Sequence, residues 1–87
     1  MAGKNKKPLK SAILDLAQIQ IDADDPPETK QTLNRLKAAN YSHDDAMALI
    51  GRVVMAECFY MMRSGGDFTM PRYVANLHRL PGDPEDL

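Results

Sequence analysis

The chain has 87 residues, of which 44% are hydrophobic and 26% are charged, and its formal net charge is −1. This length allows one domain, and the composition is that of an ordinary soluble globule. A single cysteine, Cys58, excludes a disulfide within the chain and a thiolate zinc site, and it fits a reducing cytoplasm. So short a chain buries a small fraction of its surface, which favours self-association.

Charge is divided between the two ends of the chain. The residues concerned are Lys4, Lys6, Lys7 and Lys10 at the start, and Asp83, Glu85 and Asp86 at the end. We predict a flexible basic tail over 1–7, a single helical domain over 8–81 and a flexible acidic tail over 82–87. Four lysines without aromatic residues or arginines make a weak nucleic-acid footprint, so binding of nucleic acid through them is kept only as a weaker alternative.

The first predicted helix runs from about Pro8 to Ile21 and is followed by a second that ends near Ala39. The apolar spacing predicts that the core-facing residues of the first helix are Leu9, Ile13, Leu14, Leu16, Ala17 and Ile21. Between the helices lies an acidic turn, where Asp25 is positioned to cap the second helix ahead of two prolines.

The third predicted helix, over about 43–63, is apolar on nearly every side. Ser42 is its expected cap, and Ser64-Gly65-Gly66 its stop. A fourth helix begins at Asp67 or Thr69 and ends at Pro81-Gly82. The expected fold is all-α, a compact bundle of four helices around a long apolar central helix. Because Arg52 and Glu57 interrupt that helix, no membrane span is expected, and the predicted location is the cytoplasm.

Glu57 is an acidic residue on the predicted buried side of the third helix. At about 100° per residue, Asp45, Arg52 and Arg63 share a predicted exposed stripe that also holds Ala48, Ala56 and Phe59. Glu57 lies about 140° from Arg52, on the predicted buried side. A buried carboxylate needs a cation, several hydrogen bonds or a retained proton. The partners that packing could bring to it are Lys10, Gln18, Gln20, Arg72, His78 and Arg79.

Three interpretations are open for Glu57. It is a structural acid bonded to another helix or subunit, or a functional carboxylate that acts as a metal ligand or general base with His43 or His78. In the third, the helix is rotated from this estimate and Glu57 is exposed. With only two histidines and none of the familiar catalytic motifs, we predict no metal, no cofactor and no catalytic residue, and an enzyme is the less favoured class. The apolar neighbours of Cys58 predict a core thiol with a raised pKa.

Methionines concentrate in and just after the third helix, where they suit either a core or an adaptable binding surface. Phe59, on the predicted exposed stripe, is the best candidate for a contact with another chain. The candidate interaction surface is Arg52, Met55, Phe59, Met62 and Arg63. The favoured function is a protein-protein interaction or homo-oligomerisation module, with itself as a homodimer or another protein as partner. The third helix is too apolar to be a DNA recognition helix.

Several short motifs resemble a group of small all-helical bacterial proteins that is classed as a domain of unknown function. They are Gln20-Ile21-Asp22 before Pro26-Pro27, the run from Asp45-Ala46 through Ala56-Glu57 to Arg63-Ser64-Gly65, and Asp67 with Arg72-Tyr73 before Leu77 and Leu80-Pro81. The resemblance covers residues 9–81. It implies a helical architecture and a bacterial source, with no activity attached. Some members carry histidines near the start of the long helix, where this chain has Asp44 and Ala48, and this difference weakens a metal role.

Overall fold

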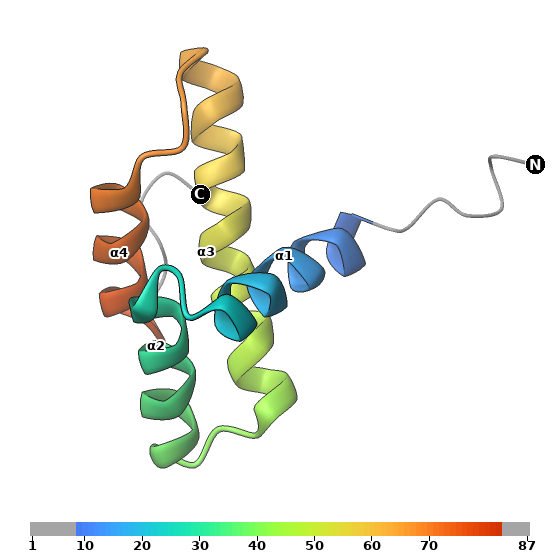
Figure 1. Cartoon of the computed structure of the whole chain (residues 1–87), viewed down its shortest axis with the longest axis vertical. Coiled ribbons are helices and arrows are strands. Elements are labelled where there is room, and N and C mark those ends of the chain that lie inside the picture. The colour runs from blue at the N-terminus through green and yellow to red at the C-terminus, as the bar shows by residue number, and fades with distance from the viewer. Residues whose placement is uncertain (1–8, 83–87) are drawn as a thin grey trace, which may run out of the picture.

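The computed structural model describes residues 9–82, which form four α-helices and contain no strand (Figure 1). The helices are α1 (Leu9–Ala23), α2 (Pro27–Ala38), α3 (His43–Ser64) and α4 (Met70–Arg79). The all-α class and the four predicted helices are confirmed. The predicted tails lie outside the described residues, except for Gly82.

Both ends of α3 are where the local sequence signals place them. The hydroxyl oxygen of Ser42 accepts a hydrogen bond from the backbone N–H of Asp45 at 3.0 Å, which satisfies one orphan donor of the first turn. Gly65 follows the last turn with φ at 70°, a left-handed conformation that favours glycine. The predicted cap and stop of the third helix are confirmed.

The start of α2 differs from its prediction. Pro26 occupies the N-cap position with no side-chain hydrogen bond, so the expected capping by Asp25 is wrong. The backbone N–H of Asp25 instead donates to the carbonyl of Gln20 at 3.0 Å and closes the end of α1. Because Pro26 and Pro27 carry no N–H, this helix start has fewer donors for a capping side chain to satisfy.

Every other helix packs against α3, and α2 also contacts α1 and α4. In Figure 1, α1 crosses α3 and its N-terminal end extends beyond the other helices. The buried hydrophobic side chains are Ile13, Ala17, Ile21, Leu33, Leu36, Ala46, Met47, Ile50, Val53, Val54, Ala56, Tyr73, Leu77 and Leu80. Ala56 was expected on the exposed stripe of α3, but it is fully buried. Its single methyl group is readily covered by larger surrounding side chains.

α1 buries only part of its apolar surface. Ile13, Ala17 and Ile21 are in the core, whereas Leu9 and Leu16 are 61% and 38% exposed. The prediction that Leu9 and Leu16 belong to the core face is therefore wrong. Leu16 lies about 100° around the helix from Ala17. The helices that pack closely against α1 are α2 and α3.

Candidate functional site

Glu57 is fully buried on α3, as predicted, and it contacts the beginning of α4. Its Oε2 accepts a hydrogen bond from the backbone N–H of Thr69 at 2.9 Å. Its Oε1 lies 3.2 Å from Nε of Arg72. This contact is an ion pair and not an aligned hydrogen bond. Of the partners considered from the sequence, packing selects Arg72, and the backbone of Thr69 was not foreseen.

The position of the Glu57 carboxylate suits the electrostatics of a helix start. Thr69 is the N-cap of α4 and makes no capping hydrogen bond with its own side chain. The first turn of a helix presents unpaired N–H groups and the positive end of the helix dipole, which favour a nearby anion. Arg72 adds a positive charge, and its guanidinium carbon lies 4.0 Å from the centre of the Tyr60 ring. Glu57 therefore acts as the missing cap and fastens α4 to α3.

The histidines that were considered as partners of Glu57 are on the surface. His43 is the exposed first residue of α3, about 21 Å along the helix from Glu57 at 1.5 Å per residue. His78 is exposed in the last turn of α4. Within residues 9–82, no three His, Cys, Asp or Glu side chains are grouped so that they could hold a metal ion.

Cys58 follows Glu57 in the sequence, and its side chain is half-buried. Burial raises the pKa of its thiol, and the negative charge of Glu57 raises that pKa further. The raised pKa expected from the sequence is confirmed. The reactive thiolate is thus disfavoured, which does not suit a nucleophile.

A second buried polar cluster joins α1, α2 and α4. The hydroxyl of Tyr73 donates to Oε1 of Gln20 at 2.7 Å, and the Thr29 hydroxyl lies 3.0 Å from that same oxygen. The Tyr73 and Thr29 hydroxyls are also 3.0 Å apart. Each hydroxyl has one proton, so two of the three contacts carry a donated proton at any instant. Burial raises the pKa of Tyr73, and the hydrogen bond with Thr29 opposes that rise.

This cluster was not found from the sequence. Gln20 was considered as a partner of Glu57, but its side chain bonds with Tyr73, a residue 53 positions later in the chain. The order of Gln20, Thr29 and Tyr73 along the chain carries no local signal of their contact. The cluster orients three helices and contains no group with a lowered pKa.

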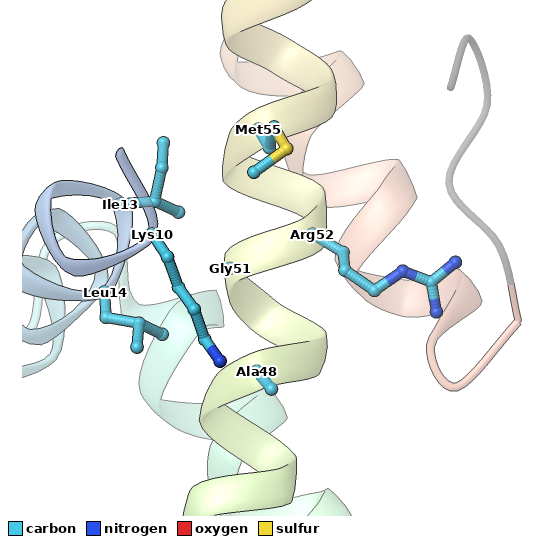
Figure 2. Close-up of a pocket in the computed structure, with 7 residues that line it drawn as sticks. All are labelled: Lys10, Ile13, Leu14, Ala48, Gly51, Arg52 and Met55. Atoms are coloured by element: carbon cyan, nitrogen blue, oxygen red, sulfur yellow. The ribbon is translucent and has the colours of Figure 1, made fainter. Parts of the chain in front are cut away.

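An apolar groove of about 280 Å³ lies between α1 and α3. Its lining residues are Lys10, Ile13, Leu14, Ala48, Gly51, Arg52 and Met55. Gly51 permits this close approach, because a Cβ at that position would lie 3.3 Å from Cδ2 of Leu14. In Figure 2, the Lys10 side chain extends toward Ala48, whereas the Arg52 side chain points away from Lys10. The two cationic groups therefore do not converge on one point of the groove.

The predicted interaction residues form a row on α3 that is exposed toward the C-terminal end of the helix. Phe59 is 38% and Met62 76% exposed, whereas Arg52 and Met55 are half-buried. Positions 52, 55, 59 and 62 alternate by three and four, the spacing of residues that meet a partner helix. We call Arg52, Met55, Phe59 and Met62 the outer face of α3. Arg63 is exposed one position beyond it.

The chain matches no known family model, no curated protein and no solved structure. The resemblance to the bacterial family of unknown function therefore stays a prediction. None of the helices within residues 9–82 has both the length and the apolarity that crossing a membrane requires. Lys4, Lys6 and Lys7 lie outside the described residues, so the alternative of nucleic-acid binding also stays a prediction.

Proposed function

We propose that this protein is a non-enzymatic protein-protein interaction module that self-associates through the outer face of α3. In this proposal, α3 is the apolar central helix of the bundle, and its apolar surface continues into the contact with a second copy. The observation that carries the proposal is the exposure of Phe59 and Met62 in one row with Met55. Aromatic and methionine side chains are enriched at protein interfaces, and methionine adapts its shape to irregular partners.

The surroundings of the row support a contact with protein. Arg52 belongs to the outer face, and Arg63 lies beside Met62 at the end of the helix. Charged groups at the edge of an apolar contact steer association and select orientation. The two polar clusters are bonded within the fold: Glu57 with Thr69 and Arg72, and Tyr73 with Gln20 and Thr29. The outer face of α3 is thus the better candidate for function.

The test is molar mass in solution, measured by light scattering across a concentration series. We expect the wild-type mass to rise from that of one chain toward that of two. Met62→Glu adds a charge at a side chain that is 76% exposed, so it should keep the fold and weaken the dimer. Asn34→Glu adds the same charge on the exposed surface of α2 and serves as the matched control.

A far-UV circular dichroism spectrum for each variant verifies that the helices are intact. A wild-type protein that keeps the mass of one chain at several hundred micromolar contradicts self-association. If the dimers of Met62→Glu and Asn34→Glu are equally stable, self-association uses another surface.

A further inference from the structure

A second exposed apolar row runs along α1. Its members are Leu9, Ala12, Leu16, Ile19 and Ala23, all of them exposed. Leu9 and Ile19 are 61% and 63% exposed, and Leu16 is 38% exposed. The row, which we call the α1 stripe, alternates by three and four residues, as in the seam of two paired helices. A helix that needed to cover only its own core would carry polar residues on this side.

The α1 stripe adjoins the outer face of α3. In Figure 2, Ile13 lies on the side of α1 toward Met55, and Leu14 lies on the side toward Ala48. At about 100° per residue, Leu9 and Leu16 are within about 60° of Ile13 and more than 130° from Leu14. The stripe is therefore on the side of α1 toward the C-terminal half of α3, which carries Phe59 and Met62. A single partner can cover both rows.

Charge along α1 indicates what that partner is. Lys10 is the second residue of α1, and the sequence has three further lysines in the seven residues before it. It ends among the exposed acids Asp22, Asp24 and Asp25. Two copies of α1 in parallel would bring like charges together, whereas an antiparallel pair brings the basic end of each to the acidic end of the other. The two ends of α1 are thus complementary in charge to the opposite ends of an antiparallel second copy.

We propose that the α1 stripe is the seam between two copies of this chain, with the two α1 helices antiparallel. The proposal rests on the proposed self-association and names its central contact. The heptad spacing sets Leu9 of one copy against Ile19 of the other, and Ala12 against Leu16. Each contact occurs twice about the two-fold axis. The small side chain of Ala12 leaves room for Leu16, so the two helices approach closely.

Cysteine cross-linking tests the orientation. Leu9→Cys and Ile19→Cys are each made in a Cys58→Ala background, and the two proteins are oxidised alone and after mixing. Antiparallel pairing predicts a disulfide-linked heterodimer only in the mixture. In a protein with one of these cysteines, the two thiols would be offset by ten residues, or about 15 Å along the seam. A disulfide needs Cα atoms within about 7 Å. Links within each single variant would show parallel pairing and overturn the proposal.

The dimer dissociation constant tests the seam itself. Ile19→Gln removes an apolar side chain from each copy without changing charge, and we expect it to raise the dissociation constant by at least about tenfold. The matched control, Asn34→Gln on the exposed side of α2, should leave the constant unchanged. If Met62→Glu weakens the dimer while Ile19→Gln does not, the seam on α1 is wrong and the proposed function stands. A chain that is monomeric at every concentration overturns both.

Discussion

Replacing Glu57 by glutamine tests what holds α4 against α3. The substitution keeps the size of the side chain and removes its negative charge. Glutamine can still accept the hydrogen bond from the N–H of Thr69, but its amide group then faces the guanidinium of Arg72, and both are donors. The attraction to the start of α4 also falls, because a neutral group interacts weakly with the helix dipole.

The expected loss in the free energy of unfolding is about 2–3 kcal/mol. Removing one partner of a buried ion pair costs about 3–5 kcal/mol when the remaining charge stays buried. Arg72 is 21% exposed and lies over the Tyr60 ring, so its charge keeps partial solvation and the cost falls below that range. For a domain of this size, the loss corresponds to a drop in melting temperature of roughly 10–20 °C.

Urea denaturation followed by circular dichroism measures this loss, with Glu28→Gln as the matched control. Glu28 is in the first turn of α2 and only half-buried, so the same substitution there should cost less than about 1 kcal/mol. If the two variants lose the same stability to within about 0.5 kcal/mol, the Glu57 carboxylate does not fasten α4 and the reasoning is refuted. A double-mutant cycle with Arg72→Gln then gives the coupling between the two side chains directly.

Three further predictions concern single side chains. Burial raises the pKa of Tyr73 above its ordinary value of 10.0, so the unfolded chain releases this proton first. The free energy of unfolding should therefore fall as the pH rises above about 10, and Tyr73→Phe should reduce that fall in urea titrations at pH 9 and 11. The raised pKa of Cys58 predicts slower reaction with a disulfide reagent at pH 8 in the native than in the unfolded protein. Glu57→Gln should speed the native reaction, and an unchanged rate would exclude the charge effect. The Arg35 guanidinium donates to the carbonyls of Leu77 at 3.0 Å and Leu80 at 2.9 Å, at the end of α4. Arg35→Ala should cost about 1 kcal/mol in thermal denaturation, and Lys37→Ala, also exposed on α2, should cost almost nothing.

The helices were predictable because their ends are set by neighbouring residues. The hydroxyl of Ser42 reaches an N–H three positions later, and Gly65 adopts a backbone conformation that few other residues accept. Each of these two signals lies in residues that are within one helical turn of one another in the sequence. The turn before α2 was less predictable, since Asp25 had two local uses: its side chain as a cap, or its N–H as a donor to α1.

The burial of Glu57 was also predictable, because it follows from helical geometry alone. Its partners were not, since they depend on which residues the loop between α3 and α4 brings back to the helix. Thr69 contributes a backbone N–H, a group that every residue except proline carries and that leaves no signature in the sequence. The cluster of Tyr73 with Gln20 and Thr29 was hidden for the same reason, because it joins three helices through distant positions.

The two apolar rows of α1 explain why its orientation was predicted wrongly. Ile13, Ala17 and Ile21 define one row, and Leu9, Leu16 and Ile19 belong to the other. Periodicity shows that each row suits burial, but it cannot distinguish burial inside the chain from burial against another chain. The number and placement of the neighbouring helices decide: α1 packs closely against α2 and α3, and α4 reaches it through the hydrogen bond of Tyr73 with Gln20. The second row is thus best explained by an apolar surface that is covered after the chain has folded.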